Sequence, residues 1–263
     1  MSADPRPGQS SLQRRSAART AVVWHALRDV LETRYADRPA AVVDIGGGTG
    51  GLAVRVAELG HQVVVVDPSP DALAILARRA DESGVADRVS GRQGDLGTLP
   101  DLVPDGGTDV VLCHGVLEIV EDPAAALAAL AATLRPGGTL SLLVNQRHAA
   151  VVTRAMAGHF TAARSLLESG SVGPATGPAA GGATNRRFTA DEITAVLDDA
   201  GFDPEAMHAV RVFVDLVPSS LVDLEPGAAQ ALVELERAVA TRPEYLALAT
   251  QIHTLATRRG ASG

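Results

Sequence analysis

Short runs of strand-forming residues alternate with helical patterns through the first half of the chain. The sequence predicts five strands, at residues 41–45, 63–66, 89–93, 110–113 and 140–144. Between them it predicts three helices, at residues 49–59, 70–83 and 123–134, each with a glycine close to its end. Apolar strands that alternate with helices are typical of a parallel sheet covered on both faces. The pattern therefore predicts an α/β fold with a mostly parallel sheet.

The regular alternation stops after Asn145, and another helical pattern precedes the first strand. These outlying helices are predicted at residues 11–35, 149–167, 190–200 and 228–240. The helix at 190–200 begins with Thr189 as N-cap and Glu192 at the capping-box position. Two further strands are predicted at residues 210–217 and 251–257. Residues 169–183 are almost entirely Gly, Ala, Pro, Ser and Thr, so we expect a mobile segment there.

The composition limits the class of protein. A chain of 263 residues suits one α/β domain with insertions. Its net charge of −8 disfavours broad adhesion to nucleic acid or to an anionic membrane, although a local basic patch remains compatible with it. There is no lysine, and abundant Ala, Val and Gly indicate a compositional bias rather than a selection of arginine for phosphate binding. Because no apolar run has signal-peptide or membrane-span character, we expect a cytoplasmic protein.

The predicted first strand leads into a glycine-rich turn, Asp44-Ile45-Gly46-Gly47-Gly48-Thr49-Gly50-Gly51. Glycine at such a turn permits positive φ and lets backbone amides approach a ligand closely. The dinucleotide fingerprint fits from Gly46 onward, and the methyltransferase glycine motif fits from Asp44 onward. Asp44 favours the second, because its carboxylate repels a diphosphate but suits the amino group and sulfonium of S-adenosylmethionine. The structural alternative is that Asp44 is a solvated strand end or a cap of the turn.

Polar residues also stand at the ends of the next three strands. Asp67 follows the glycines by about twenty residues, where a carboxylate accepts hydrogen bonds from both ribose hydroxyls. Asp95 follows the third strand, where an acid holds the adenine amino group in methyltransferases; a turn aspartate beside Gly94 is the alternative. His114 ends the fourth strand and is expected to point into the ligand crevice.

Residues 40–145 resemble the class I S-adenosylmethionine-dependent methyltransferases. Nearly the whole chain resembles the bacterial methyltransferases that esterify the carboxymethoxy group on the wobble uridine of tRNA. The motifs that carry this narrower resemblance are Val23-Trp24, Asp44-x-Gly-Gly-Gly-x-Gly, Gly60-His61-Gln62-Val63, His114-x-Val116-Leu117-Glu118-x-Val120-x-Asp122-Pro123, Leu134-Arg135-Pro136-Gly137-Gly138, Asn145, Ala157-Gly158-x-Phe160, Ala200-Gly201-Phe202, Arg211-Val212-Phe213-x-Asp215 and Ile252-His253.

The resemblance implies a Rossmann-like class I methyltransferase fold with a mostly parallel seven-stranded sheet, and S-adenosylmethionine as the cofactor. It divides the chain into a tail with a donor-covering helix (1–38), the donor-binding core (39–145), a helical insertion with a flexible lid (146–190) and the C-terminal part of the same sheet (191–263). An arginine shortly before the Val-Trp pair, here Arg19, is implied to bind the donor's carboxylate. The complete set of expected donor contacts is Arg19, Asp44, Gly46, Gly47, Gly48, Asp67, Gln93, Gly94, Asp95 and His114.

The acceptor decides which further residues the reaction needs. Methyl transfer is an in-line displacement, so the protein has to align the nucleophile with the methyl group and exclude water. A carboxylate acceptor needs only a cation to orient it, and Arg147, Arg154 or Arg211 is the candidate. An alcohol or amine acceptor needs a general base, for which the candidate is His114, although the resemblance places His114 in the donor pocket.

Several other polar residues carry no predicted chemistry. Histidines without metal-ligand spacing, which we expect to be surface or hydrogen-bonded side chains, are His61, His148, His159, His208 and His253. We therefore expect no metal site, and the single cysteine, Cys113, is expected to be a core residue. Acidic pairs that we expect on solvated helix faces are Asp198-Asp199 and Glu234/Glu236.

Three functions remain open. A tRNA methyltransferase predicts a basic surface, formed by Arg147, Arg154, Arg186, Arg187 and Arg211. A small-molecule methyltransferase predicts that residues 145–190 cover an apolar pocket, and the absence of lysine and scarcity of aromatic residues favour it. The third is a non-catalytic protein that binds S-adenosylmethionine. The expected partner is thus tRNA or a small acceptor, with no membrane, and the sequence does not determine the oligomeric state.

Overall fold

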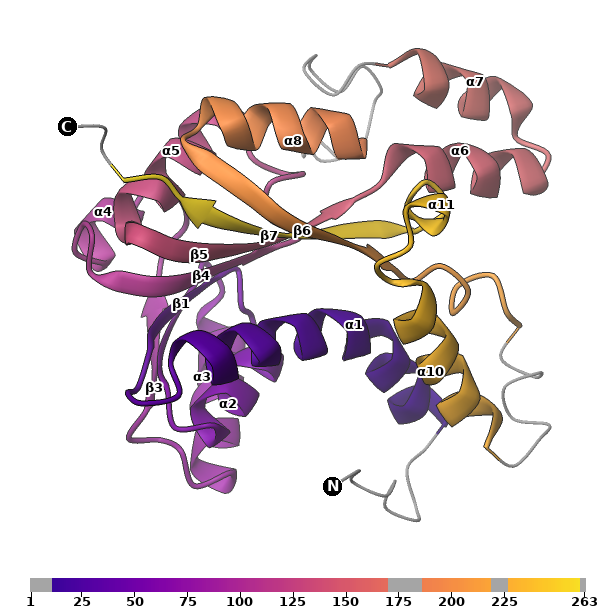
Figure 1. Ribbon diagram of the computed structural model, residues 1–263. Helices are drawn as coiled ribbons and strands as arrows, with labels where there is room; N and C mark the ends of the chain where they lie inside the picture. Colours follow the sequence, from indigo (N-terminus) through magenta and orange to yellow (C-terminus); the bar gives the residue numbers. More distant parts are fainter. Residues whose placement is uncertain (1–10, 170–185, 219–226, 261–263) are drawn as a thin grey trace.

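One sheet runs through the middle of the molecule, with helices on both of its faces (Figure 1). The computed structural model describes residues 11–169, 186–218 and 227–260. Seven strands lie in the order β3-β2-β1-β4-β5-β7-β6. Their bounds are β1 Ala41–Ile45, β2 Gln62–Asp67, β3 Val89–Gln93, β4 Thr108–His114, β5 Leu134–Asn145, β6 Phe202–Val210 and β7 Gln251–Arg258. β7 runs antiparallel to β5 and β6, and the other pairs are parallel, which confirms the predicted fold class.

The helices pack against two separate cores, one on each face of the sheet. Their bounds are α1 Ser11–Arg34, α2 Gly51–Glu58, α3 Pro70–Glu82, α4 Leu99–Leu102, α5 Pro123–Thr133, α6 Arg147–Met156, α7 Phe160–Glu168, α8 Ala190–Asp199, α10 Ala228–Val239 and α11 Pro243–Leu246. Figure 1 shows α1, α2, α3 and α10 on one face, and α4, α5 and α8 on the other. Successive strand residues point to opposite faces. Val42 therefore packs with Leu27 of α1, whereas Val43 packs with Leu130 of α5.

The strand predicted at 210–217 is wrong, and the reason is a buried glutamate. The sixth strand is Phe202–Val210, and residues 211–217 form turns. The carboxylate of Glu236 accepts hydrogen bonds from the backbone N–H groups of Val212, Phe213 and Val214, at 2.8–3.0 Å. These bonds replace the ladder of a strand, so the apolar alternation there reflects burial against α10. Glu236 is fully buried, which also corrects its expected place on a solvated helix face.

The predicted helix at 149–167 is divided into α6 and α7. Gly158 adopts a left-handed conformation (φ 79°) between them, which stops α6 and lets α7 pack against it. The capping box at Thr189 and Glu192 is present as predicted. The expected mobile segment, residues 169–183, lies outside the described residues except for Ser169. No helix in the described part of the chain is long and apolar enough to cross a membrane.

Candidate active site

The turn after β1 depends on glycine at three positions. Gly46, Gly48 and Gly50 have positive φ angles of 66°, 54° and 76°, a region that other residues rarely adopt. A Cβ added to Gly46 would lie 2.6 Å from Cγ2 of Val116, and one on Gly50 would lie 2.1 Å from Cδ1 of Leu76. The turn therefore brings bare backbone to the carboxyl edge of the sheet, where a ligand can approach it.

Asp67 connects this turn to the end of β2. Its Oδ2 accepts a hydrogen bond from the N–H of Gly48, and its Oδ1 accepts one from the N–H of Ser69, both at 2.9 Å. Each carboxylate oxygen has a second lone-pair site, so both retain the capacity to accept a ligand hydroxyl. The two backbone bonds thus hold the carboxylate in one orientation, with both oxygens still able to accept a further hydrogen bond.

Asp44 is a buried carboxyl group next to Asp67. Its side chain is 4% exposed and packs against Gly47, where a Cβ would lie 2.5 Å from Oδ2 of Asp44. Burial, and secondly the charge of Asp67, raise the pKa of Asp44 to about 7. The structure therefore places two carboxyl groups together, and neither forms an ion pair with a cation among the described side chains. A positively charged ligand at this place would favour the ionised form of Asp44.

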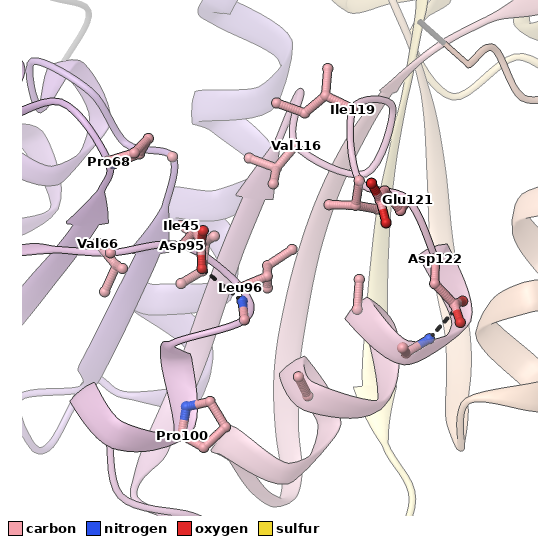
Figure 2. Close-up of a pocket in the computed structure, with 17 residues that line it drawn as sticks. Ile45, Val66, Pro68, Asp95, Leu96, Pro100, Val116, Ile119, Glu121 and Asp122 are labelled. Carbon is pink, nitrogen blue, oxygen red and sulfur yellow. Dashed lines mark hydrogen bonds between the residues drawn. The ribbon is translucent and has the colours of Figure 1, made fainter. Parts of the chain in front are cut away.

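A cavity of about 790 Å³ opens beside the turn. Figure 2 shows one wall with Asp95 and Leu96, from the segment after β3, and another with Val116 and Ile119, from the segment after β4. Asp95 forms a tight turn, because its Oδ1 accepts hydrogen bonds from the N–H groups of Gly97 and Thr98. The mostly apolar walls with an acidic group at the rim suit a flat purine ring.

Two other expected donor contacts, Gln93 and Gly94, lie at the end of β3. Gly94 lines the cavity, and the N–H of Gly94 donates to the carbonyl of Asp67 at 3.2 Å. Gln93 ends β3, and its Nε2 donates to the carbonyl of Pro68 at 3.3 Å. The structure thus brings the ends of β1, β2 and β3 into one contiguous surface.

His114 stands at the end of β4 as a neutral imidazole. Its Nε2 is hydrogen-bonded to Oγ of Ser141 at 2.9 Å. Burial lowers the pKa of His114 to about 4, so the ring carries no charge near pH 7. A group of this pKa is a weak base. The ring is suited to hydrogen bonding in the site rather than to removing a proton from an alcohol.

Two of the arginines expected to hold the acceptor are paired inside the protein. The guanidinium of Arg147 is buried and donates to both carboxylate oxygens of Glu192, at 2.7 Å. The guanidinium of Arg211 donates to Asp215 at 2.6–2.7 Å. Arg19 lies in α1, but its side chain is outside the described part of the structure.

The third arginine expected to hold the acceptor is Arg154 of α6, and it lies near Arg187. Arg187 was expected only as part of a basic surface. The pKa of Arg187 is lowered by burial and secondly by the charge of Arg154, and the charge of Glu118 opposes this, so the two arginines lie close enough to repel each other. Neither forms an ion pair of 4.0 Å or less with another described residue. Two guanidinium groups without an ion pair in the described structure can attract an anion, although the Glu118 carboxyl group acts on Arg187 from a longer distance.

Glu118 connects this arginine pair to the donor side of the site. It is 1% exposed, and its Oε1 accepts a hydrogen bond from the N–H of Asn145 at 2.8 Å. Its Oε2 is buried with no hydrogen-bond partner in the described part of the chain. Burial raises the pKa of Glu118, and the charge of Arg187 opposes that shift. Glu118 was predicted only as part of the His114-to-Pro123 motif that carries the family resemblance, without a role of its own.

The remaining predictions concern metals and the cysteine. The described residues contain no group of three His, Cys, Asp or Glu side chains that could hold a metal ion. Cys113 is fully buried, as expected for a core residue, and burial raises the pKa of its thiol to about 12. His61 accepts a hydrogen bond from the N–H of Ala40, and His253 is bonded to Ser141, which makes both satisfied polar residues.

Comparison of the sequence with known proteins finds methyltransferases. Residues 42–138 match a methyltransferase domain family. The chain is 30% identical to the tRNA 5-carboxymethoxyuridine methyltransferase of Escherichia coli (strain K12) over 250 residues, which cover 91% of this chain and 88% of that protein. It is 36% identical to the ubiquinone biosynthesis O-methyltransferase of Xanthomonas euvesicatoria pv. vesicatoria (strain 85-10) over 151 residues, which cover 56% of this chain and 62% of that protein.

Solved methyltransferase structures share the fold at low sequence identity. Geranyl diphosphate C-methyltransferase from Streptomyces coelicolor A3(2) superposes with a TM-score of 0.59 at 16% identity, covering 98% of this chain and 86% of that one. Magnesium protoporphyrin IX methyltransferase from Synechocystis PCC 6803, with bound SAH, gives 0.60 at 17% identity, covering 95% and 89%. The chain is therefore a class I S-adenosylmethionine-dependent methyltransferase, and it belongs to the family that includes the tRNA 5-carboxymethoxyuridine methyltransferase.

Proposed function

We propose that this enzyme methylates a carboxylate, namely the carboxymethoxy group of a modified wobble uridine in tRNA. The observation that carries the proposal is the pair of Arg154 and Arg187, whose guanidinium groups form no ion pair of 4.0 Å or less with another described residue, while the carboxyl group of Glu118 acts on Arg187 from a longer distance. An anionic acceptor supplies the missing negative charge. The relationship to a tRNA methyltransferase over 91% of the chain supports the finer assignment.

The donor half of the proposed site has a residue for each part of the cofactor. Asp67 would hold the ribose hydroxyls, and Asp95 with Gly94 would hold the adenine ring in the apolar cavity. Asp44 lies where the amino group or the sulfonium would meet a carboxylate. Two further donor contacts follow from the resemblance: Arg19 at the carboxylate, and His114. The glycine backbone after β1 allows the cofactor to lie against the sheet edge.

The chemistry of the acceptor agrees with the low basicity of His114. S-adenosylmethionine supplies a methyl group that is bound to positively charged sulfur and needs only an aligned nucleophile. A carboxylate oxygen already carries the negative charge, so no proton has to leave it. Arg154 and Arg187 would orient that carboxylate and exclude water around it. Arg147 and Arg211, which are already paired, would act by holding their neighbours in place.

A tRNA acceptor is also compatible with the negative net charge of the chain if the tRNA contacts only the surface around Arg186 and Arg187. The net charge of −8 would repel most of a nucleic acid, so binding must be local. Arg186 lies beside Arg187, and the guanidinium of Arg186 donates to the carbonyl of Glu121. We therefore expect weak tRNA binding that depends steeply on salt, and a cytoplasmic reaction, as the sequence suggested.

A small-molecule acceptor is the second candidate. It is favoured by the apolar walls of the cavity and by the similarity to ubiquinone biosynthesis O-methyltransferases over 151 residues. An aromatic hydroxyl would bind such walls well but would have to lose a proton. His114, with a pKa of about 4, is poorly suited to accept it.

Methyl transfer to defined acceptors tests the two candidates. The purified enzyme is incubated with labelled S-adenosylmethionine and with total tRNA from a bacterial strain in which 5-carboxymethoxyuridine accumulates unmethylated. We expect a labelled nucleoside whose methyl group is released by mild alkali, because esters hydrolyse and ethers do not. An Asp67→Ala variant should give no label. Alkali-stable label on phenolic small molecules, with none on tRNA, would overturn the proposal in favour of the second candidate.

A further inference from the structure

Four polar side chains form a hydrogen-bonded chain across the sheet, from the expected donor site to the outermost strand. They are His114 on β4, Ser141 on β5, His253 on β7 and His208 on β6. Oγ of Ser141 lies 2.9 Å from Nε2 of His114 and 2.8 Å from Nε2 of His253. Nδ1 of His253 lies 3.3 Å from Nδ1 of His208. We call this the histidine chain.

The strand register places the whole histidine chain on one face of the sheet. Leu143 is the ladder partner of both His114 and His253, and His208 is paired with His253. Ser141 precedes Leu143 by two residues, so its side chain points to the same face. Leu143 packs against α1, so this is the face that α1 covers.

The interior of the histidine chain is sealed from water. Ser141 and His253 are fully buried. Burial lowers the pKa values of His114, His208 and His253, and for His253 the two neighbouring rings lower it further. All three imidazoles are therefore neutral near pH 7. A neutral imidazole has one donor nitrogen and one acceptor nitrogen, so each ring passes on the direction of the bond that it receives.

Two arrangements of hydrogens satisfy every bond in the histidine chain and also use the hydroxyl hydrogen of Ser141 within it, whereas a Ser141 that accepts from both rings would need a further acceptor for that hydrogen. In the first, His208 donates to His253, Nε2 of His253 donates to Ser141, and the hydroxyl of Ser141 donates to Nε2 of His114. His114 then carries its proton on Nδ1. In the second, every bond is reversed and Nδ1 of His114 is an acceptor. No described residue is hydrogen-bonded to this Nδ1, so it is the nitrogen left for a ligand.

We propose that Ser141 and His253 are positioning residues that keep Nδ1 of His114 protonated, so that His114 donates a hydrogen bond to a carboxylate in the active site. The proposal rests on the donor and acceptor sites proposed above. Both ligands there bear a carboxylate, and a carboxylate only accepts hydrogen bonds, which selects the first arrangement. Because the imidazole of His114 is neutral, its hydrogen bond adds no second positive charge beside the sulfonium that carries the methyl group.

The state of the ring is measured directly by ¹⁵N NMR of histidine-labelled protein. The signals of His114 are identified by their loss in a His114→Gln variant. We expect a protonated Nδ1 and an unprotonated Nε2 in the wild type, both without ligand and with S-adenosylhomocysteine. In Ser141→Ala the link is broken, and a mixture of the two tautomers should appear. A wild-type ring with its proton on Nε2 would overturn the proposal, as would an unchanged tautomer in Ser141→Ala.

Binding measurements identify which carboxylate His114 meets. Because only the tautomer with a protonated Nδ1 donates, a mixture of the two tautomers should weaken binding in proportion to the fraction lost, by about twofold for an equal mixture. If the donor's carboxylate is the partner, Ser141→Ala weakens the binding of S-adenosylhomocysteine by that factor. The affinity for 5′-methylthioadenosine, which lacks the carboxylate, then stays unchanged. If the acceptor's carboxylate is the partner, KM for tRNA rises instead while the affinity for S-adenosylhomocysteine is kept. If the affinities for S-adenosylhomocysteine and for 5′-methylthioadenosine fall equally and KM for tRNA does not change, the proposal is contradicted.

Thr254→Val is the matched control. Thr254 neighbours His253 on β7, is fully buried, and its Oγ1 has no hydrogen-bond partner in the described structure. Its loss removes a buried hydroxyl without touching the histidine chain, so the His114 signals and both affinities should stay unchanged. A tautomer shift of equal size in Thr254→Val would show a general disturbance of the sheet and refute a specific role for Ser141. The NMR measurement needs no ligand, so its result stands even if the proposed acceptor is wrong.

Discussion

The proposed donor half of the site and the proposed acceptor half are held by different kinds of contact. In the donor half, Asp67 fixes the glycine turn through backbone bonds between adjacent strand ends. In the acceptor half, Arg154 and Arg187 come from α6 and from the segment before α8, which are far apart in the sequence. The first arrangement is determined by backbone geometry that every parallel sheet provides. The second depends on side chains that can change without altering the fold.

This difference explains why one fold serves several acceptors. The match to the methyltransferase domain family covers residues 42–138, which contain the donor half. The ubiquinone biosynthesis relatives share only 56% of the chain, whereas the tRNA methyltransferase shares 91%. Relatives that share the donor half alone are therefore weak guides to the acceptor. Variants that affect one half and spare the other test this separation.

The largest effect is expected for Asp67→Ala. The substitution removes the ribose acceptor and also the bond that holds the N–H of Gly48. Donor affinity should fall by about 100-fold or more, as expected for two lost hydrogen bonds to a charged group. Calorimetric titration with S-adenosylhomocysteine measures it. Asp71→Ala, an exposed acid in the first turn of α3, is the control and should bind normally. Normal donor binding by Asp67→Ala would show that the ribose lies elsewhere.

The acceptor half should respond to Arg187→Met with donor binding intact. Removing one of two guanidinium groups that orient a carboxylate should raise KM for tRNA by roughly 30-fold, with little change in the affinity for S-adenosylhomocysteine. Steady-state methylation assays measure the first, and calorimetry the second. Arg164→Met is the matched control, because Arg164 is exposed on α7 and paired with Glu168. An unchanged KM in Arg187→Met would remove this arginine from the acceptor site.

Donor affinity should also depend on pH through Asp44. Its pKa of about 7 is above the usual range of an aspartate, so the neutral form predominates below pH 7 and the ionised form above it. A cationic ligand group prefers the ionised form. Affinity should therefore be highest above pH 7 and fall by about tenfold from pH 8 to pH 6, with proton release on binding in the acidic range.

Asp44→Asn separates this effect from titration of the ligand itself. The variant should bind more weakly at pH 8 and should lose most of the pH dependence, because the amide does not ionise. Calorimetry in two buffers with different ionisation enthalpies measures the proton release. A wild-type affinity that stays flat from pH 6 to pH 8 would show that Asp44 does not face the cationic part of the donor.

The donor half was predictable from the sequence because its signals are local. Asp44, the glycines and Asp67 each stand at a strand end, and the order of the strands brings these ends together. The acceptor half was only partly predictable. Arg147, Arg154 and Arg211 were equivalent in sequence, and only the structure shows that Glu192 and Asp215 already pair with two of them.

The errors in the predicted fold also arise where contacts between distant segments determine the structure. Strand β6 contains Asp203, Pro204 and Glu205, which a helix–strand pattern assigns to a loop. It forms a strand because β7 offers an unpaired edge, a property of the sheet and not of the segment. Glu236 lies on a helix whose neighbouring acid, Glu234, is exposed. The periodicity of α10 alone does not show that the carboxylate of Glu236 accepts hydrogen bonds from three backbone N–H groups of residues 212–214.

Glu236→Gln tests a region that belongs to neither half, and its effect on both ligands should be the smallest. Oε1 of Glu236 accepts from Phe213 and Val214, and Oε2 accepts from Val212. An amide keeps one acceptor oxygen, so one buried N–H loses its partner, which costs about 2 kcal/mol of the free energy of unfolding. Denaturant unfolding measures this loss, with Glu234→Gln as the exposed control. The affinity for S-adenosylhomocysteine and KM for tRNA should stay within about twofold of the wild type. A large change in KM would mean that residues 212–214 contact the acceptor, and the boundary between the two halves would then have to include α10.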